Sequence, residues 1–162
     1  DLRELSAACS QLASDVALQK TIDEDDVTAY QQGRVESTGF DVADAAVEGN
    51  TPIAIINLRN ALATGTDPVL IVSALASSFR TLAKVSGASR SVKSFELAQS
   101  MAIPPWQIDK ARRQLVGWSE NAMAKAVIAI AAADADIKGA AADPIYALER
   151  AIMTVCSVKG SR

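Results

Sequence analysis

The chain has 162 residues and a formal net charge of −3, and it is 49% hydrophobic but only 4% aromatic. A core of this composition is built mainly from Ala, Leu, Ile and Val, which favours closely packed helices over a sheet sandwich. The absence of histidine excludes His-based acid–base catalysis and His metal sites. With two cysteines, no secretory signal and no uncharged apolar run of about 18 residues, we expect a reduced cytoplasmic all-α protein without a membrane segment.

Apolar residues at spacings of three and four predict an amphipathic helix at the start of the chain, with a stripe of Leu2, Leu5, Cys9, Leu12 and Val16. Four acids at 23–26 precede a short second helix that begins at Val27. Consecutive carboxylates on a helix diverge, so we interpret the acids as a helix start and not as a magnesium site. Gly33 and Gly39 predict a polar connector, followed by a third helix over 40–47.

Capping patterns then divide the chain regularly. Thr51, Asp67 and Asp143 each precede a proline and predict helices over 51–64, 67–86 and 143–158, and Ser119 predicts the start of an Ala-rich helix. Left-handed caps are expected at Gly65, Gly87, Gly139 and Gly160. The expected inward residues are Ile55, Leu58, Leu62, Val72, Leu75, Phe79, Leu82, Met123, Val127, Ile130, Ile137, Ile145, Leu148, Ile152 and Val155. The sequence predicts about nine helices in all.

Positive charge is concentrated in one stretch. Residues 1–79 carry a net charge of −8, residues 80–113 a net +5, and residues 114–162 are neutral. The basic residues of the middle stretch are Arg80, Lys84, Arg90, Lys93, Lys110, Arg112 and Arg113. They can face phosphates or an acidic partner.

The same stretch contains a helix–turn–helix pattern over residues 94–115, which raises the alternative of a sequence-specific transcription regulator. Its second helix begins with Pro104, Pro105 and Trp106, which are poor readers of base edges. We expect Trp106 to anchor the turn on neighbouring helices and Trp118 to pack in the core.

Motifs that carry catalysis are missing from the sequence. It contains no phosphate-binding Gly-rich loop, nucleophile elbow, Cys-x-x-Cys pair or zinc-protease motif. We therefore expect no enzymatic activity, no cofactor and no metal for this chain, and a purely structural helical adaptor is a third alternative.

Five segments in a particular order resemble the delta subunit of the bacterial DNA polymerase III clamp loader, and its actinobacterial members especially. In chain order they read DLRELSAACSQLA, GFDVADAAVEGN, DPVLIVSALASSFRTL, IPPWQIDKARRQLVGWS and AADADIKGAAADPIYALERAIM. The chain also starts without Met and inside a helical pattern, so we expect it to be part of a longer protein.

The resemblance implies an all-α fold with two parts. Residues 1–37 would be the carboxyl-terminal remainder of an AAA+ lid domain, and residues 38–162 a helical collar domain. It also implies partners: the ATPase subunits and delta prime through the collar, the sliding clamp through an amino-terminal part outside this chain, and primer–template DNA without sequence reading. DNA synthesis would be an activity of the whole polymerase complex, with no catalytic residue, cofactor or membrane contact here.

The resemblance further implies where contacts lie. Arg112 and Arg113 fall in a basic stretch of the family, and Arg80, Lys84 and Lys110 join them as candidate contacts to subunits or to the DNA backbone. Asp134 and Lys138 match a D-x-x-x-K signature, and Trp106 and Trp118 are the aromatic positions. An exposed i,i+4 pair contributes only about 0.3–0.5 kcal/mol, so for this pair to matter we expect Asp134 and Lys138 to be buried against another helix or subunit. Relatives can carry an aromatic in the loop that corresponds to 139–143, and this chain has none there.

Overall fold

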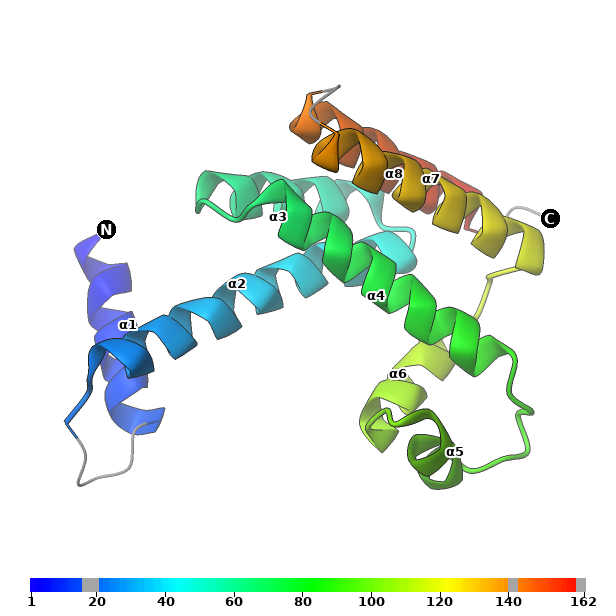
Figure 1. Cartoon of the computed structure of the whole chain (residues 1–162), viewed down its shortest axis with the longest axis horizontal. Helices are drawn as coiled ribbons and strands as arrows, with labels where there is room; N and C mark the ends of the chain where they lie inside the picture. Colours follow the sequence, from blue (N-terminus) through cyan, green and yellow to red (C-terminus); the bar gives the residue numbers. More distant parts are fainter. Residues whose placement is uncertain (16–20, 140–142, 160–162) are drawn as a thin grey trace. The chain divides into compact units, whose positions relative to one another are not determined.

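The computed structural model describes residues 1–15, 21–139 and 143–159. In these ranges the chain forms eight α-helices and no strand, as the sequence predicts for the fold class (Figure 1). The helices are α1 (Leu2–Asp15), α2 (Glu24–Val47), α3 (Thr51–Ala63), α4 (Pro68–Ser86), α5 (Ser94–Met101), α6 (Pro105–Gln114), α7 (Glu120–Lys138) and α8 (Pro144–Val158). The chain divides into two compact units, Asp1–Ser37 and Thr38–Arg162, and α2 contributes residues to both.

The first unit contains α1 and the beginning of α2. The expected helix is present, but its apolar stripe is largely exposed: Leu2 is 83% and Leu5 62% exposed, Cys9 is also exposed, and Leu12 is the buried member. Two helical segments offer too little surface to cover a whole stripe. Val16, the last predicted member, lies outside the described residues.

The acidic start of α2 is a capping arrangement, as predicted. Asp26 N donates to Asp23 Oδ1 at 3.0 Å, and Asp23 N donates to Asp26 Oδ2 at 3.2 Å. The two side chains thus satisfy N–H groups reciprocally at the helix start. Among the described residues, no group of three His, Cys, Asp or Glu side chains is placed to hold a metal ion.

The polar connector predicted between Gly33 and Gly39 is wrong, because α2 runs through both glycines. Isolated glycines weaken a helix by about 1 kcal/mol each without ending it, and no proline interrupts this one. Gly39 instead permits close packing: a Cβ there would lie 3.3 Å from Ala74 Cβ on α4. Two predicted helices are therefore one, so the described ranges contain eight helices where the sequence predicted about nine.

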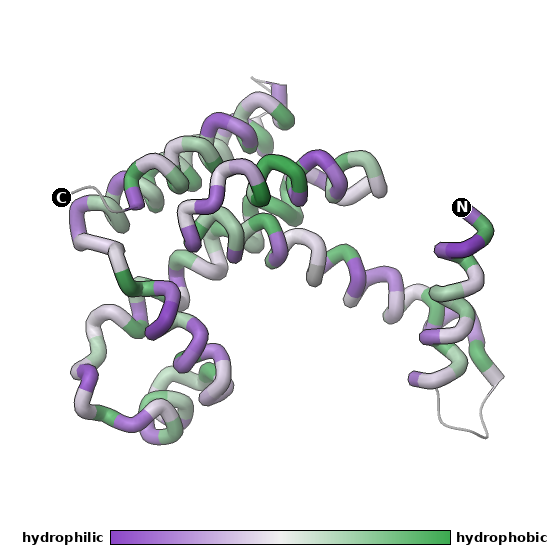
Figure 2. Tube along the Cα trace, turned by 180° about the vertical axis from the view of Figure 1, so that it is seen from behind, coloured by the Kyte–Doolittle hydropathy of each residue, from purple (hydrophilic) through white to green (hydrophobic). Residues whose placement is uncertain are grey.

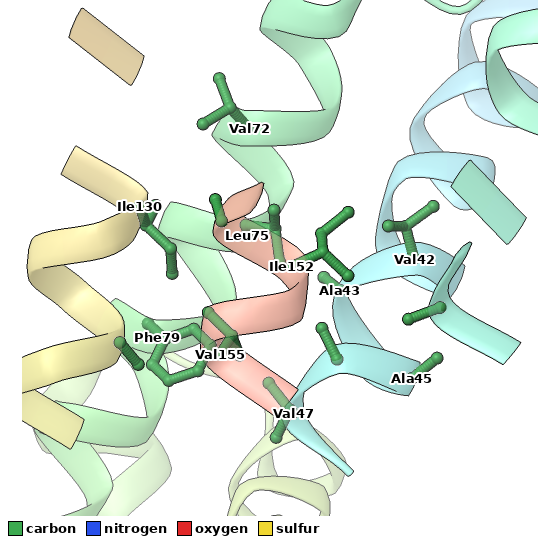
Figure 3. Close-up of a cluster of buried hydrophobic side chains, with 14 of the residues drawn as sticks. Val42, Ala43, Ala45, Val47, Val72, Leu75, Phe79, Ile130, Ile152 and Val155 are labelled. Atoms are coloured by element: carbon green, nitrogen blue, oxygen red, sulfur yellow. The ribbon is translucent and has the colours of Figure 1, made fainter. Parts of the chain in front are cut away.

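The core of the second unit lies between α2, α4, α7 and α8, with α8 in the middle of the cluster (Figure 3). In this cluster α2 contributes Val42 and Val47, α4 contributes Val72, Leu75 and Phe79, α7 contributes Ile130, and α8 contributes Ile152 and Val155. Hydrophobic and hydrophilic residues alternate along these helices, as amphipathic packing requires (Figure 2). The hydropathy of α4 reaches that of a membrane span, but its apolar residues belong to this core and it also carries Arg80 and Lys84.

Most expected inward residues are buried or half-buried in this unit, but two are not. Val127 is 43% and Ile145 47% exposed. On α7 the fully buried stripe is instead Ala122, Ala126, Ile130 and Ala133. These alanines let one face of α7 approach the neighbouring helices closely. Val127 lies on another face of α7 and is therefore exposed to solvent.

Helix starts agree with the sequence at three of four positions. Asp67 Oδ1 accepts from Val69 N at 2.8 Å, Asp143 Oδ1 from Ile145 N at 2.9 Å, and Ser119 Oγ from Ala122 N at 3.2 Å. The expected cap at Thr51 is wrong, because Asn50 accepts from Ile53 N and Thr51 is already helical.

Helix ends agree less well. Gly65 has the expected positive φ of 86°, whereas Gly87 and Gly139 end their helices with right-handed dihedrals. Gly160 lies outside the described residues. Ala102, at the end of α5, adopts a left-handed conformation that the sequence did not predict, with φ of 53°, and Gly117 also has a positive φ, of 86°.

Candidate functional site

The second helix of the helix–turn–helix pattern, α6, is fixed to α2 by polar contacts. Lys110 Nζ forms an ion pair with Asp44 Oδ2, and Gln114 Nε2 donates to Asp44 Oδ1 at 3.0 Å. The side chains of Lys110 and Asp44 are 36% and 29% exposed. Lys110, predicted as a contact to partners or DNA, thus has its charge balanced within the chain.

Arg112 is also bonded within the chain. Its Nη1 donates to Ser94 Oγ at 3.1 Å, and its Nη2 donates to the carbonyl oxygen of Val92. These bonds join the end of α6 to the first residue of α5 and to the segment before it. Arg113, the next residue, is exposed and makes no ion pair with a described residue, so only one of the two adjacent arginines presents its donors outward.

The two tryptophans differ in environment. Trp118 is half-buried: its Nε1 donates to the carbonyl oxygen of Val47 at 3.0 Å, and its ring meets Phe79 edge-to-face at 5.2 Å between centroids. The predicted packing role of Trp118 is therefore confirmed. The predicted anchoring role of Trp106 is wrong, because this side chain is 62% exposed. Ile108 and Ala111 form the buried face of α6, and Trp106 lies on the other side of that helix.

A groove of about 970 Å³ lies where the end of α4 meets the beginning of α7. The groove is lined by residues 85–88, Arg90, Arg112, residues 115–116 and 118–120, and the first turns of α7. Its apolar members include Val116 and Ile128, which are 73% and 68% exposed. Arg90 and Glu120 are the exposed charged side chains on its wall.

A second groove, of about 600 Å³, lies farther along the same two helices. Phe79, Ile130 and neighbouring alanines line it together with Arg80, Asp134 and Lys138. Asp134 and Lys138 form the predicted i,i+4 pair, with Lys138 Nζ at 2.8 Å from Asp134 Oδ1. Their side chains are 35% and 55% exposed, so the expected burial against another helix of this chain is wrong.

The two grooves share Val127 and together form one surface feature, which we call the α4–α7 trough. The first groove sets the end of α4, residues 85–88, against the start of α7, and the second sets residues 73–83 against residues 127–138, so the two helices run antiparallel (Figure 1). Sequence periodicity did not predict the trough, because it treated Val127 as core and gave no account of Val116 or Ile128. An apolar trough with charged walls is suited to binding a partner surface.

The sequence matches the family of the DNA polymerase III delta subunit, C-terminal domain, over residues 36–155. The chain belongs to this family. The matched range covers most of the second compact unit, which contains α6, both tryptophans and the trough. The resemblance recognised in the sequence is therefore confirmed.

A solved structure, titled Bacillus subtilis DNA clamp loader delta protein (YqeN), has a similar fold. The TM-score is 0.69 with 18% sequence identity, and the match covers 91% of this chain and 44% of that one. The chain thus spans less than half the length of the solved protein that it resembles. Among curated proteins, none matches the chain.

Proposed function

We propose that this chain is the carboxyl-terminal part of a clamp-loader delta subunit, and that its second unit is a collar that assembles with the other loader subunits. The observation that carries this proposal is the family match over residues 36–155. In this proposal residues 38–162 are the collar, and residues 1–37 are the end of an AAA+ lid domain. The partners are the ATPase subunits and delta prime, in the cytoplasm, and the sliding clamp binds an amino-terminal part outside this chain.

The compact units support the proposed division of the chain. The boundary between Ser37 and Thr38 lies within two residues of the start of the family match. A collar has to hold its shape while neighbouring parts move, and the second unit has the continuous buried core that this requires.

The arrangement of α5 and α6 favours assembly over sequence reading. Lys110 and Arg112 are bonded within the fold, and α6 begins with two prolines and the exposed Trp106. Few side chains of α6 are left to contact base edges, where specific readers use Arg, Asn and Gln. Arg80, Lys84 and Arg113 remain the candidate contacts to subunits or to the DNA backbone. No comparison supports a transcription regulator.

The proposal is tested by size-exclusion chromatography with light scattering. The chain is mixed with the ATPase clamp-loader subunits of the same organism and, separately, with random-sequence duplex DNA. We expect co-elution with the loader subunits and little binding to duplex. A folded chain that fails to join the subunits but binds duplex tightly would refute the proposal.

A charge-reversal variant then tests the candidate contacts. Arg80→Glu, Lys84→Glu and Arg113→Glu are combined in one variant, because all three side chains are exposed and their replacement leaves the fold intact. We expect weaker assembly or weaker DNA-stimulated clamp loading. The matched control is Lys125→Glu, an exposed lysine of α7 that lines neither groove. Unchanged assembly and unchanged loading in the triple variant would remove these three residues from the interface.

A further inference from the structure

The α4–α7 trough is long enough to hold one helix of a partner protein. It extends along α4 from Ser73 to Ser86, and 13 residues of helical rise span about 20 Å. A docked helix of nearly four turns has the same length. Helix-in-groove recognition needs such a linear apolar channel between two packed helices.

Apolar side chains are exposed in both grooves, between the charged and polar ones. Val127 joins the two grooves, and Ile128 is exposed at the first. In the second groove Ala83 and Ala131 are exposed, above the buried Phe79 and Ile130. Exposed side chains of this kind on one face usually mark a contact with another protein. An apolar stripe on the partner, repeating every three to four residues, would bury them.

The trough carries positive side chains that no carboxylate of the described residues neutralises. Arg80 and Arg90 line it and make no ion pair with a described residue. Arg112 lines the first groove, and its guanidinium donates to Ser94 Oγ and to a carbonyl, neither of which carries a charge. Asp109 is linked to Arg112 through Ser94, whose hydroxyl donates to the Asp109 carboxylate and accepts from the guanidinium.

The carboxylates in the trough are already compensated. Asp134 is paired with Lys138. Glu120 lies in the first turn of α7, where the N-terminal N–H groups of the helix favour a negative charge. Carboxylates on a partner therefore meet arginines without a competing intramolecular pair.

We propose that the α4–α7 trough is the docking site for a helix of a neighbouring clamp-loader subunit, with an apolar stripe against Val127 and Ile128 and acidic residues against Arg80 and Arg90. This rests on the proposed function, since it names the surface through which the collar meets its partner. Nucleic acid fits the trough less well, because the carboxylates of Asp134 and Glu120 repel a phosphate backbone and the exposed apolar side chains of Val127 and Ile128 offer it no hydrogen-bond donor.

The test uses reporter cysteines in the assembled complex. In a Cys9→Ser background the native thiol that remains, Cys156, is buried. Ile128→Cys then places a thiol in the trough, and Phe95→Cys places one on α5, at an exposed residue that lines neither groove. Maleimide labelling rates are measured for the free chain and for the complex with the ATPase subunits. We expect assembly to slow labelling of Ile128→Cys by at least about tenfold, and Phe95→Cys reports that the reagent stays active.

A photoactivatable maleimide on Ile128→Cys identifies the occupant. We expect capture of a helical segment of another loader subunit that has more Asp and Glu than Lys and Arg. In parallel, the double variant Arg80→Glu and Arg90→Glu should weaken assembly by at least about tenfold and reduce its salt dependence, while Lys125→Glu changes it less than about twofold.

Each outcome decides the proposal. Labelling of Ile128→Cys at the same rate in the free chain and in a formed complex would overturn the docking site while leaving the proposed function intact. Capture of a basic segment, of a second copy of this chain or of DNA would also overturn it. Failure of the unmodified chain to form any complex would overturn both proposals.

Discussion

The indole Nε1 of Trp118 donates a hydrogen bond at 3.0 Å to the carbonyl oxygen of Val47. Val47 is the last residue of α2, and its residue surface is completely buried. Carbonyl groups in the last turn of a helix have no partner in the same helix, so the indole satisfies one that water does not reach. The segment before α7 is thereby fixed to the end of α2, and the edge-to-face contact with Phe79 fixes it to α4.

Replacement of Trp118 should therefore be strongly destabilising. Trp118→Phe removes the donor and leaves the Val47 carbonyl unpaired, which together with the lost ring contacts lowers the free energy of unfolding by about 2–4 kcal/mol. Urea denaturation followed by circular dichroism measures the change. Trp106→Phe is the matched control, since this side chain is 62% exposed and its replacement should cost less than about 0.5 kcal/mol. Equal losses in the two variants would contradict the anchoring role of Trp118.

The pair formed by Lys110 and Asp44 should show a measurable coupling energy. Both side chains are partly buried, and Asp44 also accepts from Gln114. A double-mutant cycle with Lys110→Met and Asp44→Asn should give a coupling of about 1 kcal/mol that decreases at high salt. Chemical denaturation at low and high salt supplies the four free energies of unfolding. A coupling of zero at low salt would show that the pair does not join α6 to α2 in solution.

Ala102→Gly should stabilise the protein. Ala102 is exposed and adopts a left-handed conformation that costs a residue with a Cβ about 1–2 kcal/mol. Glycine removes this strain but raises the entropy of the unfolded chain, so the net gain is about 0.5–1 kcal/mol. The same change at Ala132, exposed in the middle of α7, should instead cost about 1 kcal/mol. Thermal unfolding of the two variants should shift in opposite directions, and shifts of the same sign would refute the argument.

Helix starts and buried helix faces were predictable from the sequence where residues close together in the chain determine them. Asp67, Ser119 and Asp143 cap their helices with side-chain oxygens, and the spacing of Leu75 and Phe79 fixes the buried face of α4. Local rules failed at Gly33 and Gly39, because neighbouring residues carry the helix through an isolated glycine. They failed again at Val127, because the alanines of α7 let its other face approach the core.

The candidate site was less predictable than the fold. The sequence identified a basic stretch, but it did not show that Lys110 and Arg112 are used within the chain, because their partners lie far away in sequence or on another helix. It also could not reveal the trough, which depends on how closely α4 and α7 approach. Charge density along a chain indicates where positive residues are, while packing decides which of them remain available to a partner.

Cys156 should make stability depend on pH in the alkaline range. The thiol is buried, and this burial raises its pKa above the ordinary value of 9.0, against the smaller lowering effects of a hydrogen bond with Thr51 and of the Lys159 charge. The unfolded chain therefore releases this proton at lower pH than the folded chain. The stabilising contribution is complete below the unfolded pKa and is lost as the pH rises through the folded pKa, with a slope of up to about 1.4 kcal/mol per pH unit.

The measurement compares Cys9→Ser with Cys9→Ser, Cys156→Ala, so that all other titrating groups are common to both proteins. The difference between their free energies of unfolding should be constant between about pH 6 and 8 and should change above about pH 9, to the disadvantage of the chain that keeps Cys156. In the native protein at neutral pH, a maleimide should label Cys9, which is exposed, and leave Cys156 unmodified until the chain unfolds. A difference that stays constant through pH 10.5 would mean that the thiol is not held in its protonated form by the fold.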